Sequence, residues 1–193
     1  MSDPVLHVLA GPNGAGKSAF FEYVLGPATH LEFVNADEIA AQRWPDDPIY
    51  KSYDAALLAS ARRMALIEAG TSFITETVFS HDSKLDLVRS AIDAGYLVSL
   101  HVILVPEALA VARVASRVVL GGHDVPEHKI RQRYVRLWPL VVAAIGVVGN
   151  TIVYDNSRAS DPFRIAARFD HGSLIGEPEW PPWAPDVLVS AAR

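Results

Sequence analysis

The sequence predicts an α/β fold, with a mainly parallel five-stranded sheet flanked by helices. Five short apolar segments rich in Val, Ile, Leu and Phe recur along the chain, and several lack the polar alternation of half-exposed strands. Segments with apolar residues at helical spacing lie between them, as expected for strand–helix–strand units. A glycine-rich motif directly after the first apolar segment points to the same class.

Length and composition indicate one domain, residues 1–193, that is large enough to bury a core. The formal net charge of −5 does not favour a nucleic-acid partner. The chain contains no cysteine, which excludes a disulfide framework and a thiolate metal site. An acidic residue near the start and the short, Pro139-interrupted apolar window give no sign of a signal peptide or a membrane span. We therefore expect a cytoplasmic protein.

The predicted strands and helices alternate along most of the chain. The strands are expected at residues 5–10, 31–35, 72–78, 97–105 and 150–156. Two helical segments end in glycines that favour helix termination, Gly70 and Gly95. Residues 107–149 form a long helical insert, which we interpret as a lid, with two halves joined at "GGHDVP". A small edge hairpin is expected around "FDHG", within a C-terminal region of about residues 160–193.

The segment "GPNGAGKS" is a complete match to the phosphate-binding motif G-x-x-x-x-G-K-[ST], and it lies between a predicted strand and an amphipathic helix. Such a loop directs backbone N–H groups at phosphate oxygens, its lysine reaches the β- and γ-phosphates, and its serine coordinates Mg²⁺. Here these two residues are Lys17 and Ser18, which predicts an ATP–Mg²⁺ site with Ser18 as the metal ligand. The predicted nucleotide-binding residues are Gly11, Pro12, Asn13, Gly14, Ala15, Gly16, Lys17 and Ser18.

The rest of the chain narrows the class of P-loop protein. A GTPase would carry an Asn-Lys-x-Asp motif after a late strand, where this chain has "YDNSR". A motor or transporter ATPase would end its most apolar strand in an aspartate, whereas the segment 97–105 runs into Pro106. These absences favour a small kinase with the fold of the nucleoside-monophosphate kinases.

Two carboxylates lie at or near the carboxyl ends of predicted strands, at the edge of the sheet where α/β proteins bind ligands. Asp37 fits the catalytic base that accepts the proton of an acceptor hydroxyl, and it also fits the cap of the following helix. Glu76 fits an acceptor contact, a ligand of a magnesium-bound water, or an acid paired with a nearby cation. We place Asn35 and Thr77, which lie close to these acids in the chain, on the acceptor-binding side with them.

The predicted lid is rich in arginine. Arg113 and Arg117 share one helix face, and Lys129, Arg133 and Arg136 form a stripe on the second half, with Arg131 pointing away. Gly121 and Gly122 form a flexible joint, His123 is expected to be a turn residue, and Pro126 marks the start of a helix. Such faces can neutralise a transferring phosphoryl group, or they can be solvated basic surface.

Five segments, "GPNGAGKS", "FVNADEI", "FITETVFS", "SRVVLGGHDVPEHKIRQRY" and "VYDNS", occur in the order found in the zeta-toxin family, and over about residues 5–157 the chain resembles this family of P-loop kinases. The resemblance implies transfer of the ATP γ-phosphate to the 3′-hydroxyl of UDP-N-acetylglucosamine, and an antitoxin protein as partner. It implies that Asp37 is the base, that Glu76 touches the acceptor, and that Asn156 lies near the adenine. It also implies catalytic roles for Lys17 and for the lid arginines Arg117 and Arg131 or Arg133.

The sequence therefore predicts an ATP-dependent kinase that phosphorylates a hydroxyl group of a small molecule. Residues 77–80 are "TVFS", which supplies few of the basic contacts expected for a sugar nucleotide, so a kinase of another metabolite is an alternative. An ATP-binding regulator or weak ATPase controlled by a partner protein is the alternative from a different class.

Overall fold

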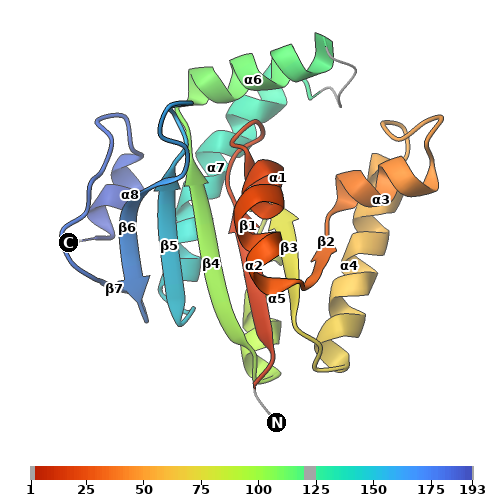
Figure 1. Ribbon diagram of the computed structural model, residues 1–193, viewed down its shortest axis with the longest axis horizontal. Helices are drawn as coiled ribbons and strands as arrows, with labels where there is room; N and C mark the ends of the chain where they lie inside the picture. The colour runs from red at the N-terminus through yellow and green to blue at the C-terminus, as the bar shows by residue number, and fades with distance from the viewer. Residues whose placement is uncertain (1–2, 120–124, 193) are drawn as a thin grey trace.

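The computed structural model describes residues 3–119 and 125–192, and these residues form one seven-stranded sheet with helices on both faces (Figure 1). The strand order is β2-β3-β1-β4-β5-β6-β7. The strands are β1 Val5–Ala10, β2 Glu32–Val34, β3 Phe73–Thr77, β4 Leu97–Leu104, β5 Asn150–Asp155, β6 Arg164–Asp170 and β7 Ser173–Leu174. Strands β1 to β5 are parallel, so their carboxyl ends share one edge of the sheet.

The helices follow the strands in the predicted alternation. The first helical segment comprises α1 Lys17–Phe20, the π-helical turn η1 Phe21–Leu25 and α2 Gly26–Thr29. The remaining helices are α3 Ala36–Arg43, α4 Ser52–Glu68, α5 Ser83–Asp93, α6 Glu107–Val119, α7 Glu127–Ile145 and α8 Asp186–Ser190. Within the described residues, no helix combines the length and apolar character needed to cross a membrane.

Alternation along the strands divides the core into two layers. On β4, Val98, Leu100, Val102 and Leu104 pack with apolar residues of α4, α5 and α7 in the larger cluster. Ile103 faces the opposite side, in the smaller cluster that includes Phe20 and Ala110 from α1 and α6. Strands buried on both faces need few polar positions, which is why the sequence of the central strands reads as continuous apolar runs.

The five predicted parallel strands are confirmed at their positions, but the predicted number of strands is wrong. β6 and β7 extend the sheet, and β6 pairs antiparallel with β5 over its whole length. The reason lies in the connection, because residues 156–163 are too few for the crossover that a parallel partner requires.

The predicted C-terminal hairpin is confirmed as β6 and β7. Its turn contains His171 and Gly172, both with positive φ (45° and 78°), as tight hairpin turns require. The chain then continues along the outer edge of β6, where Ile175 N donates to Arg168 O (2.9 Å) and Glu179 N donates to Ala166 O (2.7 Å). Trp180 and Trp183 pack against the larger core cluster, and α8 packs on α7.

The predicted lid consists of α6 and α7, which lie above and behind the carboxyl edge of the sheet (Figure 1). Pro126 is the N-cap residue of α7, as its position in the sequence indicates, and α7 continues through Pro139 to Ile145. The proposed flexible joint, Gly121 and Gly122, and the turn residue His123 lie outside the described residues.

A pair of histidines lies on the face of the sheet that α1 covers. His7 Nδ1 and His101 Nε2 are 3.1 Å apart, His101 Nδ1 is 3.4 Å from Tyr154 Oη, and the Phe20 ring lies against His101. Burial, reinforced by the nearby His7, lowers the pKa of His101 from its usual 6.5 to about 3. In the folded protein His101 therefore stays neutral in the mildly acidic pH range in which an exposed histidine binds a proton.

This burial predicts a loss of stability in mild acid. The unfolded chain binds a proton at His101 below about pH 6.5 and the folded chain does not, so the free energy of unfolding falls as the pH decreases from about 6.5 towards 3. Urea unfolding of the wild type at pH 7.5 and 5.5 should show a decrease about 1 kcal/mol larger than that of His101→Gln. His128→Gln, a change on the exposed surface of α7, should match the wild type. An equal decrease in wild type and His101→Gln would contradict the assignment.

Candidate nucleotide and acceptor site

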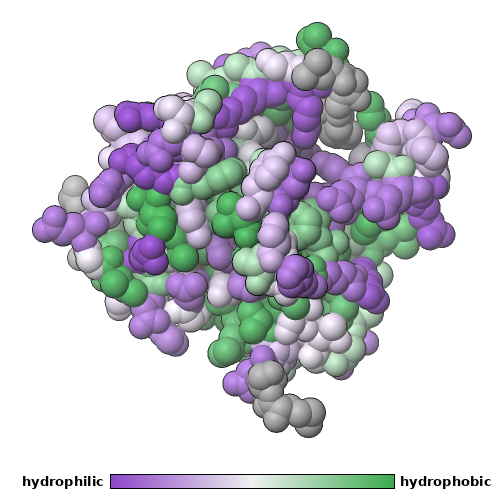
Figure 2. All heavy atoms as spheres, in the orientation of Figure 1, coloured by the Kyte–Doolittle hydropathy of each residue, from purple (hydrophilic) through white to green (hydrophobic). Residues whose placement is uncertain are grey.

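A cavity of about 680 Å³ lies at the carboxyl edge of the parallel strands, bounded by the P-loop and by parts of α3, α4, α5, α6 and α7. Figure 2 shows hydrophilic side chains gathered along α6 and over α3, next to this edge of the sheet. The polar residues that line the cavity are Asn13, Lys17, Ser18, Asn35, Asp37, Ser52, Tyr53, Arg63, Glu76, Thr77, Ser80, His81, Lys84, Arg113, Arg117 and Arg133.

The P-loop joins β1 to α1 in a conformation that only glycine allows at several points. Gly14 and Gly16 have φ of 74° and 91°, and a Cβ atom on Gly16 would lie 2.5 Å from Asn156 Nδ2. The N–H groups of the first turn of a helix have no acceptor within that helix, so the start of α1 presents donors to an anion. The fold thus gives the loop the form of a phosphate cradle.

Asn156 holds this loop from the opposite side. Its side chain is buried, and its Nδ2 donates to Ala15 O at 2.8 Å, which links the end of β5 to the P-loop. The sequence placed Asn156 near the adenine, and that contact stays a prediction. Its role in supporting the P-loop was missed because 140 residues separate the two segments, and no local pattern joins them.

Lys17 lies almost fully buried at the base of the cavity. Its Nζ donates to Gly11 O and Pro12 O, both at 3.0 Å, and lies 3.7 Å from Glu76 Oε1. Burial lowers the pKa of Lys17, while the charges of Glu76 and Asp37 oppose that change. Gly11 and Pro12 thus contribute carbonyl groups that orient the lysine, whereas Asn13 lines the cavity itself.

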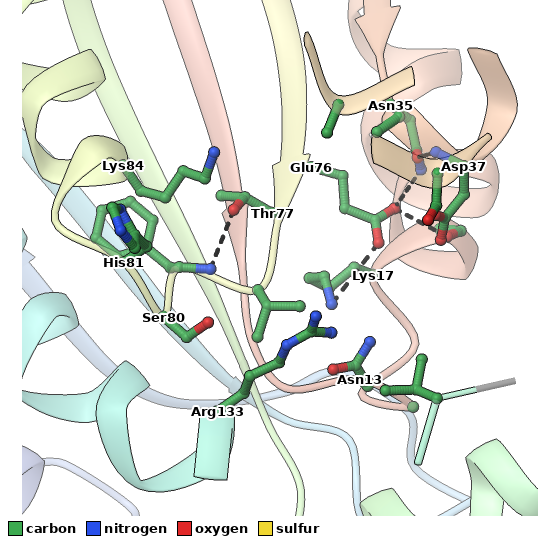
Figure 3. Close-up of a pocket in the computed structure, with 18 of the residues that line it drawn as sticks. Asn13, Lys17, Asn35, Asp37, Glu76, Thr77, Ser80, His81, Lys84 and Arg133 are labelled. Atoms are coloured by element: carbon green, nitrogen blue, oxygen red, sulfur yellow. Dashed lines mark hydrogen bonds and ion pairs between the residues drawn. The ribbon is translucent and has the colours of Figure 1, made fainter. Parts of the chain in front are cut away.

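Glu76 contacts both the P-loop and the start of α3 (Figure 3). Its Oε2 accepts hydrogen bonds from Ser18 Oγ (2.8 Å) and from Asn35 Nδ2 (2.9 Å). Because β3 lies directly beside β1 in the sheet, the strand-end carboxylate reaches the hydroxyl of the P-loop. The next residue, Thr77, also lines the cavity, and its Oγ1 accepts a hydrogen bond from Phe79 N at 3.0 Å.

This pairing of Ser18 with Glu76 fits a magnesium site. Mg²⁺ prefers oxygen ligands and usually binds through one or two carboxylates together with phosphates and water. A hydroxyl and a carboxylate within hydrogen-bond distance beside a phosphate cradle supply that donor set. In the described part of the chain there is no cluster of three or more His, Cys, Asp or Glu residues that would hold a metal without phosphate.

The residue that caps α3 is Asn35, so the interpretation of Asp37 as the helix cap is wrong. Asn35 Oδ1 accepts a hydrogen bond from Asp37 N at 2.8 Å, while its amide group donates to Glu76. Asn35 can make both bonds because an amide has a donor as well as an acceptor, whereas an ionised carboxylate can only accept. Asp37 occupies the first turn of α3 with its side chain exposed and bordering the cavity.

The lid arginines divide into two groups. Arg113, Arg117 and Arg133 line the cavity, and burial lowers the pKa of Arg113. Arg131 is not among the lining residues, since it forms ion pairs with Glu127 (2.8 Å) and Glu107 (3.2 Å) on the exposed surface. The catalytic role of Arg131 stays a prediction, and in this structure its side chain is engaged outside the cavity. The salt bridges place its guanidinium between α6 and α7, where it joins the two helices.

Two cavity residues, Arg63 of α4 and Lys84 of α5, were absent from the sequence-based predictions. Arg63 is 6% exposed, on the helix face that also carries the buried residues Ala59 and Ile67. That spacing was visible in the sequence, because an arginine with apolar residues four positions away on each side interrupts a buried stripe. A charged residue in such a stripe is a signal of a polar cavity.

Comparison with known proteins agrees with this class of site. A family model described as AAA domain (AAA_33) matches residues 6–137. An uncharacterized protein of Haemophilus influenzae is 28% identical over 125 residues, which cover 64% of this chain and 88% of that protein. A candidate kinase from Chloroflexus aurantiacus is similar in structure, with a TM-score of 0.53 at 17% identity over 63% of this chain and 70% of that one.

Two further solved structures resemble the chain and contain partner proteins. In a structure of AvrRxo1-ORF1:-ORF2 with ATP, one chain has a TM-score of 0.70 and 18% identity, covering 91% of this chain and 61% of that one. The PezAT chromosomal toxin–antitoxin system of Streptococcus pneumoniae contains a chain with a TM-score of 0.61 and 15% identity, covering 80% and 68%. This chain therefore spans about three fifths of the AvrRxo1 chain.

The fold and the site define a P-loop domain of the kinase-like type, with a mixed sheet, flanking helices and a nucleotide-binding loop. Since the family model covers more than half of the residues, the chain belongs to the AAA domain family AAA_33.

The contact between Asn156 and the P-loop predicts a coupled loss of stability and nucleotide binding. Asn156→Ala leaves the buried carbonyl of Ala15 without its donor, which should lower the free energy of unfolding by about 1–3 kcal/mol. Urea unfolding and titration with a fluorescent ATP analogue measure the two effects. Asn150→Ala, at an exposed position at the start of the preceding strand β5, is the matched control and should change neither. Equal behaviour of the two variants would refute the supporting role.

Proposed function

We propose that the protein is an ATP-dependent kinase that transfers the γ-phosphate to a hydroxyl group of a small molecule. The observation that carries the proposal is the composition of the cavity. It joins the P-loop residues Lys17 and Ser18, the exposed carboxylate of Asp37 and arginines from the two lid helices. Phosphoryl transfer depends on positioning and on charge neutralisation, and these are the groups it requires.

Ser18 and Glu76 are the proposed holders of Mg²⁺, Ser18 directly and Glu76 through a bound water. Bound there, Mg²⁺ would neutralise the phosphate oxygens and favour departure of ADP. Lys17 is the proposed contact of the β- and γ-phosphates, and its hydrogen bonds to two loop carbonyls already orient its amine. The glycine-rich segment provides backbone donors for the remaining phosphate oxygens.

Asp37 is the proposed general base. Its charge acts on Lys17, so the carboxylate lies within electrostatic reach of the phosphate end of the cavity. Its side chain is not needed as the cap of α3, since Asn35 supplies that cap. A carboxylate held on a helix start and open to the cavity can accept the proton of a hydroxyl as the oxygen attacks phosphorus.

Arg113, Arg117 and Arg133 are the proposed charge-neutralising residues of the lid. They come from α6 and α7, so both helices must keep their positions for all three to face one phosphoryl group. Arginine suits this role because its planar guanidinium can bind two phosphate oxygens at once.

UDP-N-acetylglucosamine is the first acceptor to test, because of the resemblance to the zeta-toxin kinases. Release of ADP from Mg-ATP, measured with and without this sugar nucleotide, separates the alternatives. Strong stimulation establishes a sugar-nucleotide kinase. ATP binding without stimulation would exclude UDP-N-acetylglucosamine as the acceptor and leave a kinase of another metabolite as the proposed function.

The alternative function is that of an ATP-binding regulator held by a partner protein. It is favoured by the fact that two of the similar chains come from complexes, AvrRxo1-ORF1:-ORF2 and PezAT. In that case an antitoxin-like partner would cover the nucleotide cavity. Tight ATP binding with no acceptor-dependent ADP release, for any hydroxyl compound, is the result that would favour the regulator.

The role of Asp37 predicts that binding and transfer can be separated. Asp37→Asn keeps the shape of the side chain and removes its basicity, so acceptor-dependent ADP release should fall by about 10²–10⁴-fold. ATP affinity should change by no more than about twofold, because the proposed triphosphate contacts are elsewhere. Lys17→Ala, in contrast, should lose ATP binding itself.

Asp93→Asn is the matched control, since Asp93 is exposed at the last residue of α5. Its ADP release should equal that of the wild type. Full activity of Asp37→Asn would remove the residue from the mechanism while leaving the P-loop assignments in place.

A further inference from the structure

Arg63 and Lys84 form a second group of cations in the cavity, away from the P-loop. Arg63 comes from α4 and Lys84 from the first turn of α5, whereas Lys17 and the lid arginines come from α1, α6 and α7. Lys84 has a lowered pKa, caused by burial and then by the positive charge of Arg63, so the two cations lie near one another. In Figure 3 the Lys84 side chain extends towards Thr77 on β3.

Arg63 and the P-loop residue Ser18 contact β3 from opposite faces of the sheet. Glu76 points to the P-loop, where it meets Ser18, while the preceding residue Thr75 points to the other face of the sheet. Thr75 Oγ1 accepts a hydrogen bond from Arg63 Nη1 at 3.3 Å and donates to Val34 O at 3.0 Å. The cavity extends over the end of β3 and is lined from both sides. An anion at Arg63 and Lys84 would therefore be distinct from the triphosphate at the P-loop.

The protein does not neutralise these two charges from within. Across residues 3–119 and 125–192, no carboxylate lies within the 4.0 Å ion-pair distance of either side chain. A guanidinium has five N–H donors, and the bond to Thr75 uses one of those on Arg63. Burying a charge is costly unless it is paired, so an anion bound at this arginine would offset that cost.

The neighbouring Arg62 shows what an ordinary arginine of α4 does. Its Nε and Nη2 bond both oxygens of Glu32 at 2.7 and 2.6 Å, on the exposed surface. The chain as a whole is acidic, with a formal charge of −5, yet its described cavity lining holds six Lys or Arg residues and two acids. The positive charge is thus concentrated where a ligand enters.

We infer that Arg63 and Lys84 bind an anionic group, a phosphate or a carboxylate, of the molecule whose hydroxyl is phosphorylated. The inference rests on the proposed kinase function and names its substrate class, an anionic hydroxyl compound. With its anion held between α4 and α5, such an acceptor would present its hydroxyl towards Asp37 and the P-loop. Arg63 and Lys84 then determine which hydroxyl compounds the enzyme accepts.

Anion binding can be measured before any acceptor is known. The protein is saturated with Mg²⁺ and a non-hydrolysable ATP analogue to fill the P-loop site, and its melting temperature is followed as inorganic phosphate or malonate is added. Binding to the folded state raises the melting temperature, and at a given ligand concentration the rise is larger for tighter binding. A larger effect of phosphate or of malonate identifies the phosphate or the carboxylate as the preferred group.

Arg63→Gln and Lys84→Met should each weaken binding of the preferred anion by at least about tenfold, since each removes a charged hydrogen bond. Arg63→Lys retains the charge and should bind more tightly than Arg63→Gln. Arg62→Gln and Lys129→Met are the matched controls at exposed positions, and both should bind like the wild type. Lys84→Met tests the inference on a half-buried residue, where loss of folding is not expected.

Two results would overturn the inference. One is no effect of either anion on the nucleotide-bound wild type, and the other is an equal effect in wild type, Arg63→Gln and Lys84→Met. The proposed kinase function fails in a different way, through the absence of acceptor-dependent ADP release while anion binding persists. The two failures are therefore distinguishable.

Discussion

The carboxylate of Glu76 is the point at which the separate parts of the site are joined. Through Ser18 and Lys17 it contacts the P-loop, and through Asn35 it contacts the start of α3, which carries Asp37. A buried or half-buried charge is stable only when its lone pairs are satisfied, and here three different groups satisfy them. The position of the proposed base relative to the phosphate cradle is thus fixed by one side chain of β3. A change in the register of β3 against β1 would separate them.

The electrostatics of the cavity follow from this arrangement. Two acids line the cavity together with cations from four helices and the P-loop, so the same space offers sites for a metal ion, a hydroxyl proton and phosphate. Lys17 pairs with Glu76, whereas Arg63 and Lys84 have no carboxylate within ion-pair distance among the described residues. Positive charge is left facing the space that a ligand would fill.

The sequence was informative where physical constraints are local. The P-loop, the five parallel strands and the two lid helices follow from glycine placement and from the spacing of apolar residues, and they were predicted at the correct places. Asn35 and Asp37 were confused because both are good capping residues, and only the reach of Asn35 to Glu76 decides between them. Helical spacing put Arg131 and Arg133 on different faces, but the family resemblance left both as candidates, and spacing does not reveal the ion pairs of Arg131.

The remaining gaps come from contacts between distant segments. The contacts that bring distant segments together define the roles of Arg63, Lys84 and Asn156. The spacing of residues along the sequence does not predict such contacts. The C-terminal hairpin was predicted, but its pairing with β5 as part of the main sheet was not, because a strand pattern does not specify the partner strand. The antiparallel direction of β6 is set by the short connection after β5.

The C-terminal segment after the hairpin has a consequence for behaviour in concentrated solution. An open strand edge offers unpaired N–H and C=O groups on which another chain can add, and β6 is long enough to serve as such a template. Residues 173–179 occupy that edge with their own backbone hydrogen bonds, and the tryptophans beyond them hold the segment against the core. At the opposite margin, β2 has only three residues. The last part of the chain thus covers the edge of β6 on which a strand of another molecule could otherwise add.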